Sequence, residues 1–393
     1  MSNTAFIFHE DVLKYKFNDQ HPFRQERLIL TLELLKQLGA LNEEELIRPR
    51  KADEHELLWV HTPGYIEAVK QLSVPAIPPS SEELAEKYGF HTEDTPYFEN
   101  MHEVTSAIVG GSIEAAEQVM SGKALHALHL GGGLHHAMKN KSSGFCIYND
   151  ASVAISYIRH HYGAKVLYID TDVHHGDGVQ FSFYSDPNVC TFSIHETGKY
   201  LFPGTGAVNE RGDGEGFGAC FNMPVEPYTE DESWLESFQE YIEKVAAFFQ
   251  PDVIVSQHGC DAHYYDPLSH IHCSMKVYLE MPKIIHELAH KWCGGKWIAL
   301  GGGGYDIWRV VPRAWSLLWL IMNDHAAVKQ IENNPLLPLP GEWLKLWNNE
   351  QAPDYVPATW LDAPNAWEDI TRRKEITQKN RKTKEIGMLY LPK

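Results

Sequence analysis

The stretch Val166-Leu-Tyr-Ile-Asp-Thr-Asp-Val-His-His-Gly-Asp-Gly178 indicates both the architecture and the chemistry of the chain. The mostly apolar run from Lys165 to Ile169 predicts a buried strand. Carboxylates and imidazoles crowd the residues from Asp170 to Asp177, and the glycines among them allow the backbone to turn. In an extended chain residues i and i+2 point to the same side, so we expect Asp172 and His174 to converge beyond the strand's end. Such a pair of ligands favours a divalent metal ion.

Three other predicted strands also end in loops rich in glycine and polar residues. These strands and the loops that follow them are Ala124 to Leu130 with Gly131-Gly-Gly-Leu-His-His136, Asp252 to Gln257 with His258-Gly-Cys-Asp261, and Trp297 to Leu300 with Gly301-Gly-Gly-Gly-Tyr305. The strands alternate with helical patterns, which predicts an α/β fold with a mostly parallel central sheet flanked by helices. Ligands of open α/β sheets bind at the carboxyl edge of the strands. We therefore expect these loops to share one cleft at that edge.

Three further features of the sequence concern a loop, a helix and the C-terminal region. The proline-rich segment Ser73 to Pro96 predicts a long loop with Asp94 near its end, and Thr229 with Glu232 predicts a capping box before a helix from Trp234 to Phe249. Beyond Asp324 the sequence becomes rich in proline and tryptophan and then basic. These changes predict a catalytic domain over 1–324 and a C-terminal extension over 325–393 that packs on it.

Composition limits the class of protein. The chain has 393 residues, 43% of them hydrophobic, and a formal net charge of -19. That charge argues against direct binding to nucleic acid, which depends on lysine and arginine, and is compatible with cationic substrates such as lysine-rich protein segments. The most apolar stretch, Ala314 to Met322, is shorter than the ~20 residues that span a bilayer, and Met1 to His9 lacks the features of a signal peptide. We expect a cytoplasmic protein without a membrane partner, and the six scattered cysteines predict buried thiols.

Asp261 completes a candidate metal site with Asp172 and His174. A catalytic zinc site has three protein ligands and one open position, as this set offers. Its oxygen-rich character keeps Fe²⁺ and Mn²⁺ open as alternatives. The alternative without a metal is a buried aspartate and histidine joined by a hydrogen bond at a turn.

The neighbouring pair His135 and His136 is typical of acid–base chemistry. Asp170 and Asp177 are carboxylates that each can accept an Nδ1–H hydrogen bond and so orient a ring. An oriented imidazole beside an activated water molecule is a general base. Taken alone, the two histidines could equally be polar loop residues.

Tyr305 follows a run of glycines on which its hydroxyl could reach a developing oxyanion. The alternative is an aromatic residue that packs beside Trp308. The glycine run lacks the lysine and the serine or threonine of a P-loop, which excludes that motif.

Together these motifs resemble those of the histone deacetylase superfamily, in its order, over about residues 5 to 320. The resemblance is closest to class I-like members and to their bacterial relatives, the acetoin utilization proteins. The motifs that carry it are Gly132-Gly-Leu-His-His136, Gly144-Phe145, Asp170-Thr-Asp-Val-His-His-Gly-Asp177, Phe202-Pro-Gly-Thr-Gly206, Gly259-Cys-Asp261 and Gly302-Gly-Gly-Tyr305.

The resemblance implies an arginase/deacetylase fold and zinc-dependent hydrolysis of Nε-acetyl-lysine to lysine and acetate. It implies that zinc is bound by Asp172, His174 and Asp261. His136 with Asp177 would be the general base, His135 with Asp170 would adjust the electrostatics, and Tyr305 would donate to the oxyanion.

The same resemblance implies further binding residues. They are Gly144, Phe145, Phe202 and Leu268 along a substrate channel, Asp94 at its rim, Arg27 near an acetate-release cavity, and Asp170, Asp172, His174, Ser193 and Ile194 around a structural potassium ion. An acetylated protein is the expected partner, and acetoin metabolism suggests an acyl-CoA synthetase.

Other functions stay open at this point. An acetylpolyamine amidohydrolase would use the same site on small acetylated amines, although Leu268 stands where some polyamine-selective relatives have a glutamate. A non-catalytic protein that binds acetylated partners is a second alternative. An arginase-like binuclear site would need a second set of bridging carboxylates, which the sequence does not offer.

Overall fold

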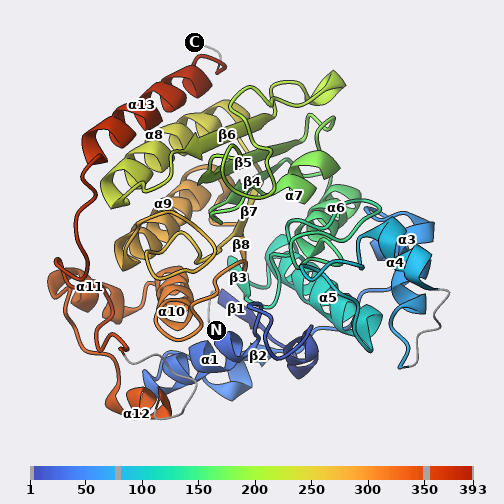
Figure 1. Ribbon diagram of the computed structural model, residues 1–393, viewed down its shortest axis with the longest axis horizontal. Helices are drawn as coiled ribbons and strands as arrows, with labels where there is room; N and C mark the ends of the chain where they lie inside the picture. The colour runs from blue at the N-terminus through green and yellow to red at the C-terminus, as the bar shows by residue number, and fades with distance from the viewer. Residues whose placement is uncertain (1–3, 76–80, 348–354, 392–393) are drawn as a thin grey trace.

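A parallel sheet runs through the middle of the molecule (Figure 1). The computed structural model describes residues 4–75, 81–347 and 355–391, and within these the sheet has eight strands in the order β2-β1-β3-β8-β7-β4-β5-β6. The strands are β1 (Thr4–Ile7), β2 (Leu46–Ile47), β3 (His126–His129), β4 (Val166–Asp170), β5 (Val189–Glu196), β6 (Cys220–Val225), β7 (Val253–Gln257) and β8 (Trp297–Leu300). All pairs are parallel, which confirms the predicted α/β fold. β8, which comes last in sequence among these eight strands, lies between β3 and β7.

Helices cover both faces of the sheet (Figure 1). The helices are α1 (Glu26–Gln37), α2 (Glu54–Leu57), α3 (Pro63–Gln71), α4 (Glu82–Tyr88), α5 (Met101–Met120), α6 (Asp150–Tyr162), α7 (Asp177–Ser182), α8 (Asp231–Phe249), α9 (Met275–Cys293), α10 (Val311–Met322), α11 (Ala326–Asn333), α12 (Gly341–Leu344) and α13 (Arg373–Met388). The helices α5 and α6 pack on one face of the sheet, whereas α8, α9 and α10 contribute to the hydrophobic core on the other.

Strand β4 shows how alternation divides the core between the two faces. Val166 and Tyr168 belong to the cluster that includes α5 and α6 residues, whereas Leu167 and Ile169 belong to the larger cluster with α8 and α9. Since both faces of a parallel sheet are covered by helices, apolar residues point to both faces of β4 instead of to one face only. All five residues of β4 are buried, so the loop that follows it starts from a rigid base.

Several local predictions need correction. The predicted loop over Ser73 to Pro96 contains α4, although its residues 76–80 lie outside the described part of the chain. The predicted capping box is wrong, because Glu230 is the N-cap of α8 and the Thr229 hydroxyl donates to the carbonyl of Glu226. The sequence patterns also did not reveal β6 or α7. All six cysteines are buried and free, as expected.

The segment after α10 lies against the rest of the molecule. Helix α13 contacts α8 and β6, and the buried amide of Asn380 donates to the hydroxyls of Thr229 (2.8 Å) and Ser233 (2.9 Å). The division into domains at residue 324 stays a prediction. In the parts of the chain that the structure describes, no helix is long and apolar enough to cross a bilayer.

Asp362 anchors this C-terminal segment to the rest of the protein. Its carboxylate accepts hydrogen bonds from the buried guanidinium of Arg313 (2.9 Å) and the backbone N–H of Met275 (2.8 Å), and it pairs with the ring of His263 (2.9 Å). Although burial opposes it, the charges of His263 and Arg313 lower the pKa of Asp362 far below its ordinary value.

We expect Asp362→Ala to lower the free energy of unfolding by about 3–5 kcal/mol, because it leaves the Arg313 charge buried without its partner. The matched control is Asp369→Ala, at an exposed ion pair with Arg373, which should change stability by about 0.5 kcal/mol or less. Urea unfolding at pH 7 measures both. Since the folded-state pKa is depressed, the contribution is present above the unfolded pKa of about 3.9 and is lost as the pH falls below it. If Asp362→Ala lowered the free energy of unfolding no more than Asp369→Ala does, Asp362 would not be an anchor of the C-terminal segment.

Candidate active site

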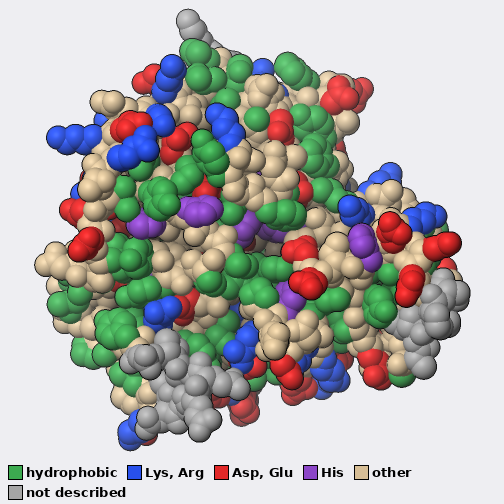
Figure 2. Space-filling view, viewed as in Figure 1, with side chains coloured by type: hydrophobic (Ala, Val, Ile, Leu, Met, Phe, Trp, Pro, Cys, Tyr) green, Lys and Arg blue, Asp and Glu red, His purple; other side chains and the backbone are tan. Residues whose placement is uncertain are grey.

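Four loops meet at the carboxyl edge of the sheet because their strands are neighbours. The strands β3, β8, β7 and β4 lie side by side in that order, and each leads into one of the loops singled out in the sequence. Figure 2, in the same view as Figure 1, shows histidine side chains across the middle of the face that these strands approach. The loops singled out in the sequence therefore lie together at one edge of the sheet, as predicted.

Asp172, His174 and Asp261 form a buried cluster. Their ligand atoms lie within 4.8 Å of one another. The Nδ1 atom of His174 is 3.2 Å from Oδ1 of Asp172 and 3.1 Å from Oδ2 of Asp261. The convergence comes from a turn after β4, in which Oδ1 of Asp172 accepts the backbone N–H of His174 (3.0 Å), and not from continued strand alternation.

The backbone holds the two carboxylates in place. Oδ2 of Asp172 accepts hydrogen bonds from the side-chain amide of Gln257 and from the backbone N–H of Gly303, both at 2.8 Å, and Oδ1 of Asp261 accepts the N–H of Val173 at 2.9 Å. A Cβ atom on Gly303 would lie 2.1 Å from Oδ2 of Asp261, so only glycine fits there. Gln257 was not predicted, although its place at the end of β7 is a signal for it.

This cluster fits a divalent metal ion. Two buried carboxylates and one imidazole converge on a common point, which is the oxygen-and-nitrogen donor set of catalytic metal sites. Burial and the adjacent charge of Asp172 raise the pKa of Asp261 to about 6, and a cation between the two carboxylates would remove this cost.

The His135 imidazole is paired with Asp170. The Nδ1 atom of His135 lies 2.8 Å from Oδ2 of Asp170, which also accepts the hydroxyl of Tyr168 at 2.7 Å. Although burial opposes it, the charges of Asp170 and Asp172 raise the pKa of His135 to about 9. The pairing with Asp170 therefore favours the protonated form of the His135 ring.

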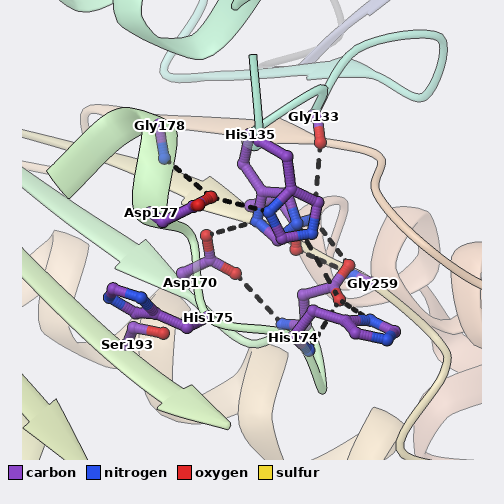
Figure 3. Close-up of polar contacts among 12 residues, drawn as sticks. Gly133, His135, Asp170, His174, His175, Asp177, Gly178, Ser193 and Gly259 are labelled. Carbon is purple, nitrogen blue, oxygen red and sulfur yellow. Dashed lines mark hydrogen bonds and ion pairs between the residues drawn. The ribbon is translucent and has the colours of Figure 1, made fainter. Parts of the chain in front are cut away.

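The His136 imidazole is paired with Asp177 at the start of α7. Figure 3 shows the carboxylate of Asp177 beside Gly178. Nδ1 of His136 lies 2.7 Å from Oδ1 of Asp177, and the same oxygen accepts the backbone N–H of Gly178 (2.9 Å). Burial lowers the pKa of His136 well below its ordinary value, so its ring is neutral at pH 7. Burial raises the pKa of Asp177 to about 6, and above that pH its carboxylate accepts the Nδ1–H of His136. The ring is left with a free Nε2 lone pair.

The buried Asp150 fixes the loop that carries both histidines. Its carboxylate accepts the backbone N–H groups of Gly133 (2.9 Å) and Leu134 (2.8 Å) and the hydroxyl of Ser112. The amide of Asn149 donates to the carbonyl of His135 (3.2 Å). Sequence reasoning missed this role of Asp150, because its distant backbone partners cannot be inferred from the sequence.

Tyr305 is held at its backbone. Its N–H donates to the buried carboxylate of Asp266 (2.8 Å), a residue that sequence reasoning missed. Its ring lies 5.6 Å from that of Phe145. Burial, with the charges of Asp261 and Asp172, raises the pKa of the Tyr305 hydroxyl well above its ordinary value, so it remains a proton donor.

Two of the predicted channel residues, Gly144 and Phe202, lie against the ring of His136. A Cβ atom on Gly144 would lie 2.4 Å from the ring of His136 and 2.9 Å from that of Phe202, so the absent side chain leaves room between them. The rings of Phe202 and His136 are 4.9 Å apart. The exposed carboxylate of Asp94 accepts the backbone N–H of Gly144 (3.0 Å), which places it at the rim.

The remaining predicted residues lie around this centre. Arg27 is buried, and its guanidinium donates to the carbonyls of Gly302 (2.9 Å) and Gly304 (3.1 Å) behind the Tyr305 loop. Leu268 is half-buried, and its N–H donates to Asp266 (3.0 Å). Ser193 on β5 is in register with Asp170, and Ile194 is the next residue along the strand. Acetate release, the contact of Leu268 with a substrate and the potassium site stay predictions.

Comparison with known proteins identifies the family. The model of the histone deacetylase domain matches residues 21–322. The chain belongs to the histone deacetylase family. It is therefore a hydrolase of the deacetylase type, as the sequence motifs implied.

Relatives and solved structures agree over nearly the whole chain. The chain is 52% identical over 383 residues to acetoin utilization protein AcuC of Bacillus subtilis (strain 168), covering 98% of this chain and 96% of that protein. It is 47% identical to the AcuC protein of Staphylococcus aureus (strain MRSA252), covering 97% and 95%. The crystal structure of a histone deacetylase homolog from Aquifex aeolicus has a TM-score of 0.80 and 29% identity, and it covers 96% of this chain and 99% of its own. The crystal structure of a histone deacetylase homolog complexed with SAHA has a TM-score of 0.81 and 30% identity, and it also covers 96% of this chain and 99% of its own.

Proposed function

We propose that this histone deacetylase family member hydrolyses Nε-acetyl-lysine amides in proteins to lysine and acetate. One observation carries the proposal: a neutral imidazole lies next to the candidate metal cluster. The ring of His136, which Asp177 orients, is 6.0 Å from the ring of His174 in that cluster. Asp172, His174 and Asp261 would hold the metal, which we propose to be zinc, with Fe²⁺ as the alternative in the cell. When bound, it would supply a Lewis acid that polarises the amide carbonyl and makes water more acidic.

His136 has the properties of the general base. Its neutral Nε2 atom takes the proton of the attacking water, while Asp177 stabilises the resulting imidazolium through Nδ1. The same ring then gives that proton to the nitrogen of the departing lysine. His135, whose charge is held by Asp170, adds positive potential beside the reacting carbonyl.

Tyr305 supplies the hydrogen bond that strengthens during the reaction. Its hydroxyl stays protonated, and the contact between Asp266 and its backbone N–H fixes the loop from which it reaches the site. A donor aimed at the position of the developing oxyanion stabilises the transition state more than the substrate.

The shape of the entrance favours a lysine side chain. The ring of Phe202 lies beside His136 and that of Phe145 beside Tyr305, and we propose that these two rings form apolar walls for the methylene stem of a lysine. Asp94 at the rim would accept a backbone N–H of the substrate. We further propose a structural potassium ion near Asp170 and Ser193.

The second candidate is an acetylpolyamine amidohydrolase. Such a substrate carries another positive charge beyond the scissile amide and needs a carboxylate to receive it. The half-buried Leu268 offers none, and this observation favours the protein substrate.

Acetate release from three substrates tests the proposal. They are an acetyl-lysine peptide, acetylspermidine and an acetylated acyl-CoA synthetase, the last because the relatives are named for acetoin utilization. We expect turnover of both lysine substrates, its loss with chelator, and its return with Zn²⁺. Preference for acetylspermidine would move the function to polyamines, and no turnover of any substrate by the metal-loaded protein would overturn the deacetylase proposal.

A further inference from the structure

Three imidazoles meet at the edge of the sheet opposite to the active site. His126 is the first residue of β3, whereas the active-site loops follow the carboxyl ends of the strands. His286 and His290 lie on α9, one helical turn apart, so both point from the same side of that helix. The cluster therefore shares no residue with the hydrolytic centre.

The three rings turn the same kind of atom toward one another. Nε2 of His286 lies 3.1 Å from Nε2 of His126 and 3.0 Å from Nε2 of His290, and the three ligand atoms all lie within 4.8 Å. Two nitrogens that each lie about 2.0–2.1 Å from one zinc ion are separated by about 2.9–3.4 Å. The two separations from His286 thus match those of ligands to a common metal ion, and the nitrogens of His126 and His290 lie within 4.8 Å of each other.

Packing positions the rings before any ion binds. The ring of Trp297, on the adjacent strand β8, lies 5.8 Å from that of His126 and 5.9 Å from that of His286. The rings of His286 and His290 are 4.6 Å apart and nearly perpendicular. A strand, a helix and a buried indole therefore fix the geometry, and the ion does not have to order a loose segment.

The cluster is electrically suited to a cation. Burial, with the nearby rings of His286 and His290, lowers the pKa of His126 to about 4. Burial also lowers the pKa of His286. Neutral imidazole is the form that binds metal ions, and the negative charge of Asp324 lies close enough to act on both residues. His290 is exposed, which leaves the ion a path from solvent.

We propose that His126, His286 and His290 form a second metal site for a divalent transition-metal ion, with water in the remaining positions. Three imidazoles favour zinc, nickel or copper over magnesium or calcium. The ion would join α9 to β3, two elements that are far apart in sequence. Because a ligand that binds only the folded state stabilises it, this ion would raise the melting temperature.

The test is the number of Zn²⁺ ions bound after equilibrium dialysis, measured by mass spectrometry of the metal. We expect His290→Ala and His286→Ala to bind one equivalent fewer per chain than the wild type. The control is His91→Ala, an exposed histidine outside the cluster, which should match the wild type. His290 is exposed on a helix, where alanine is well tolerated, so the variant is expected to fold.

A second measurement uses Co²⁺, whose visible absorption reports coordination. The difference spectrum between the wild type and His290→Ala should contain a cobalt band, and added Zn²⁺ should raise the melting temperature of the wild type more than that of the variant. Equal Zn²⁺ stoichiometry in the wild type, His286→Ala and His290→Ala would overturn the proposal. That result would leave the hydrolytic function untouched, since the two sites share no ligand.

Discussion

Asp261→Asn should remove the metal ion from the hydrolytic site and lower kcat/KM by about a thousandfold or more. The carboxamide can keep the hydrogen bond from Val173 through its oxygen, but it then turns an NH₂ group, which cannot bind a metal, toward His174. Loss of several kcal/mol of Lewis-acid stabilisation corresponds to that fold-change. Metal analysis and acetate release from an acetyl-lysine peptide measure the two effects.

The control for this variant is Asp369→Asn, an equal chemical change at an exposed ion pair. It should keep both metal and turnover. An Asp261→Asn protein with the metal content and activity of the wild type would exclude Asp261 as a ligand. The variant also separates the two metal proposals, because it should still bind an ion at the three histidines, whereas His290→Ala should not.

Tyr305→Phe should lower kcat by about 10²–10³-fold and change KM little. The substitution removes only the hydroxyl, so the ring keeps its contact with Phe145 and the backbone keeps its bond to Asp266. A donor that acts mainly in the transition state affects kcat more than substrate binding. Steady-state kinetics on the peptide, together with unchanged metal content, test this role.

The matched control is Tyr264→Phe, at an exposed tyrosine three residues beyond Asp261 in the sequence. It should leave both constants within about twofold of the wild type, since surface substitutions usually have small effects. If Tyr305→Phe also lost less than about tenfold in kcat, the packed aromatic residue considered from the sequence would be the better description of Tyr305.

The sequence predicted the central strands because each is a short apolar run between strong turn signals. β6 was missed for a physical reason. It includes Asn222 and Pro224, which argue against a central strand. Among the described residues β6 pairs with β5 alone, so it is an edge strand, and an edge strand tolerates proline. The capping box failed because Thr229 uses its hydroxyl on the preceding turn. Local sequence patterns reveal neither the edge position of β6 nor the hydrogen-bond partner of Thr229.

The site residues could be predicted where reactive side chains stand close together in the sequence, in a loop that follows a strand. Asp172, His174 and the histidine pair each follow a strand directly, and the parallel sheet then brings their loops together. The residues that hold them could not be predicted in the same way. Gln257, Asp150 and Asp266 act through backbone N–H groups or carboxylates that lie far away in the sequence. Such contacts exist only after the chain has folded.

The central place of β8 has a consequence for synthesis of the chain. Until residues 297–300 leave the ribosome, β3 and β7 are separate open edges, and exposed edges invite pairing with other chains. About three quarters of the polypeptide is therefore synthesised before the strand that joins the two halves of the sheet. Tyr305 follows β8 in the sequence, so the candidate active site is complete only after that strand has been made, and the two open edges stay exposed until then.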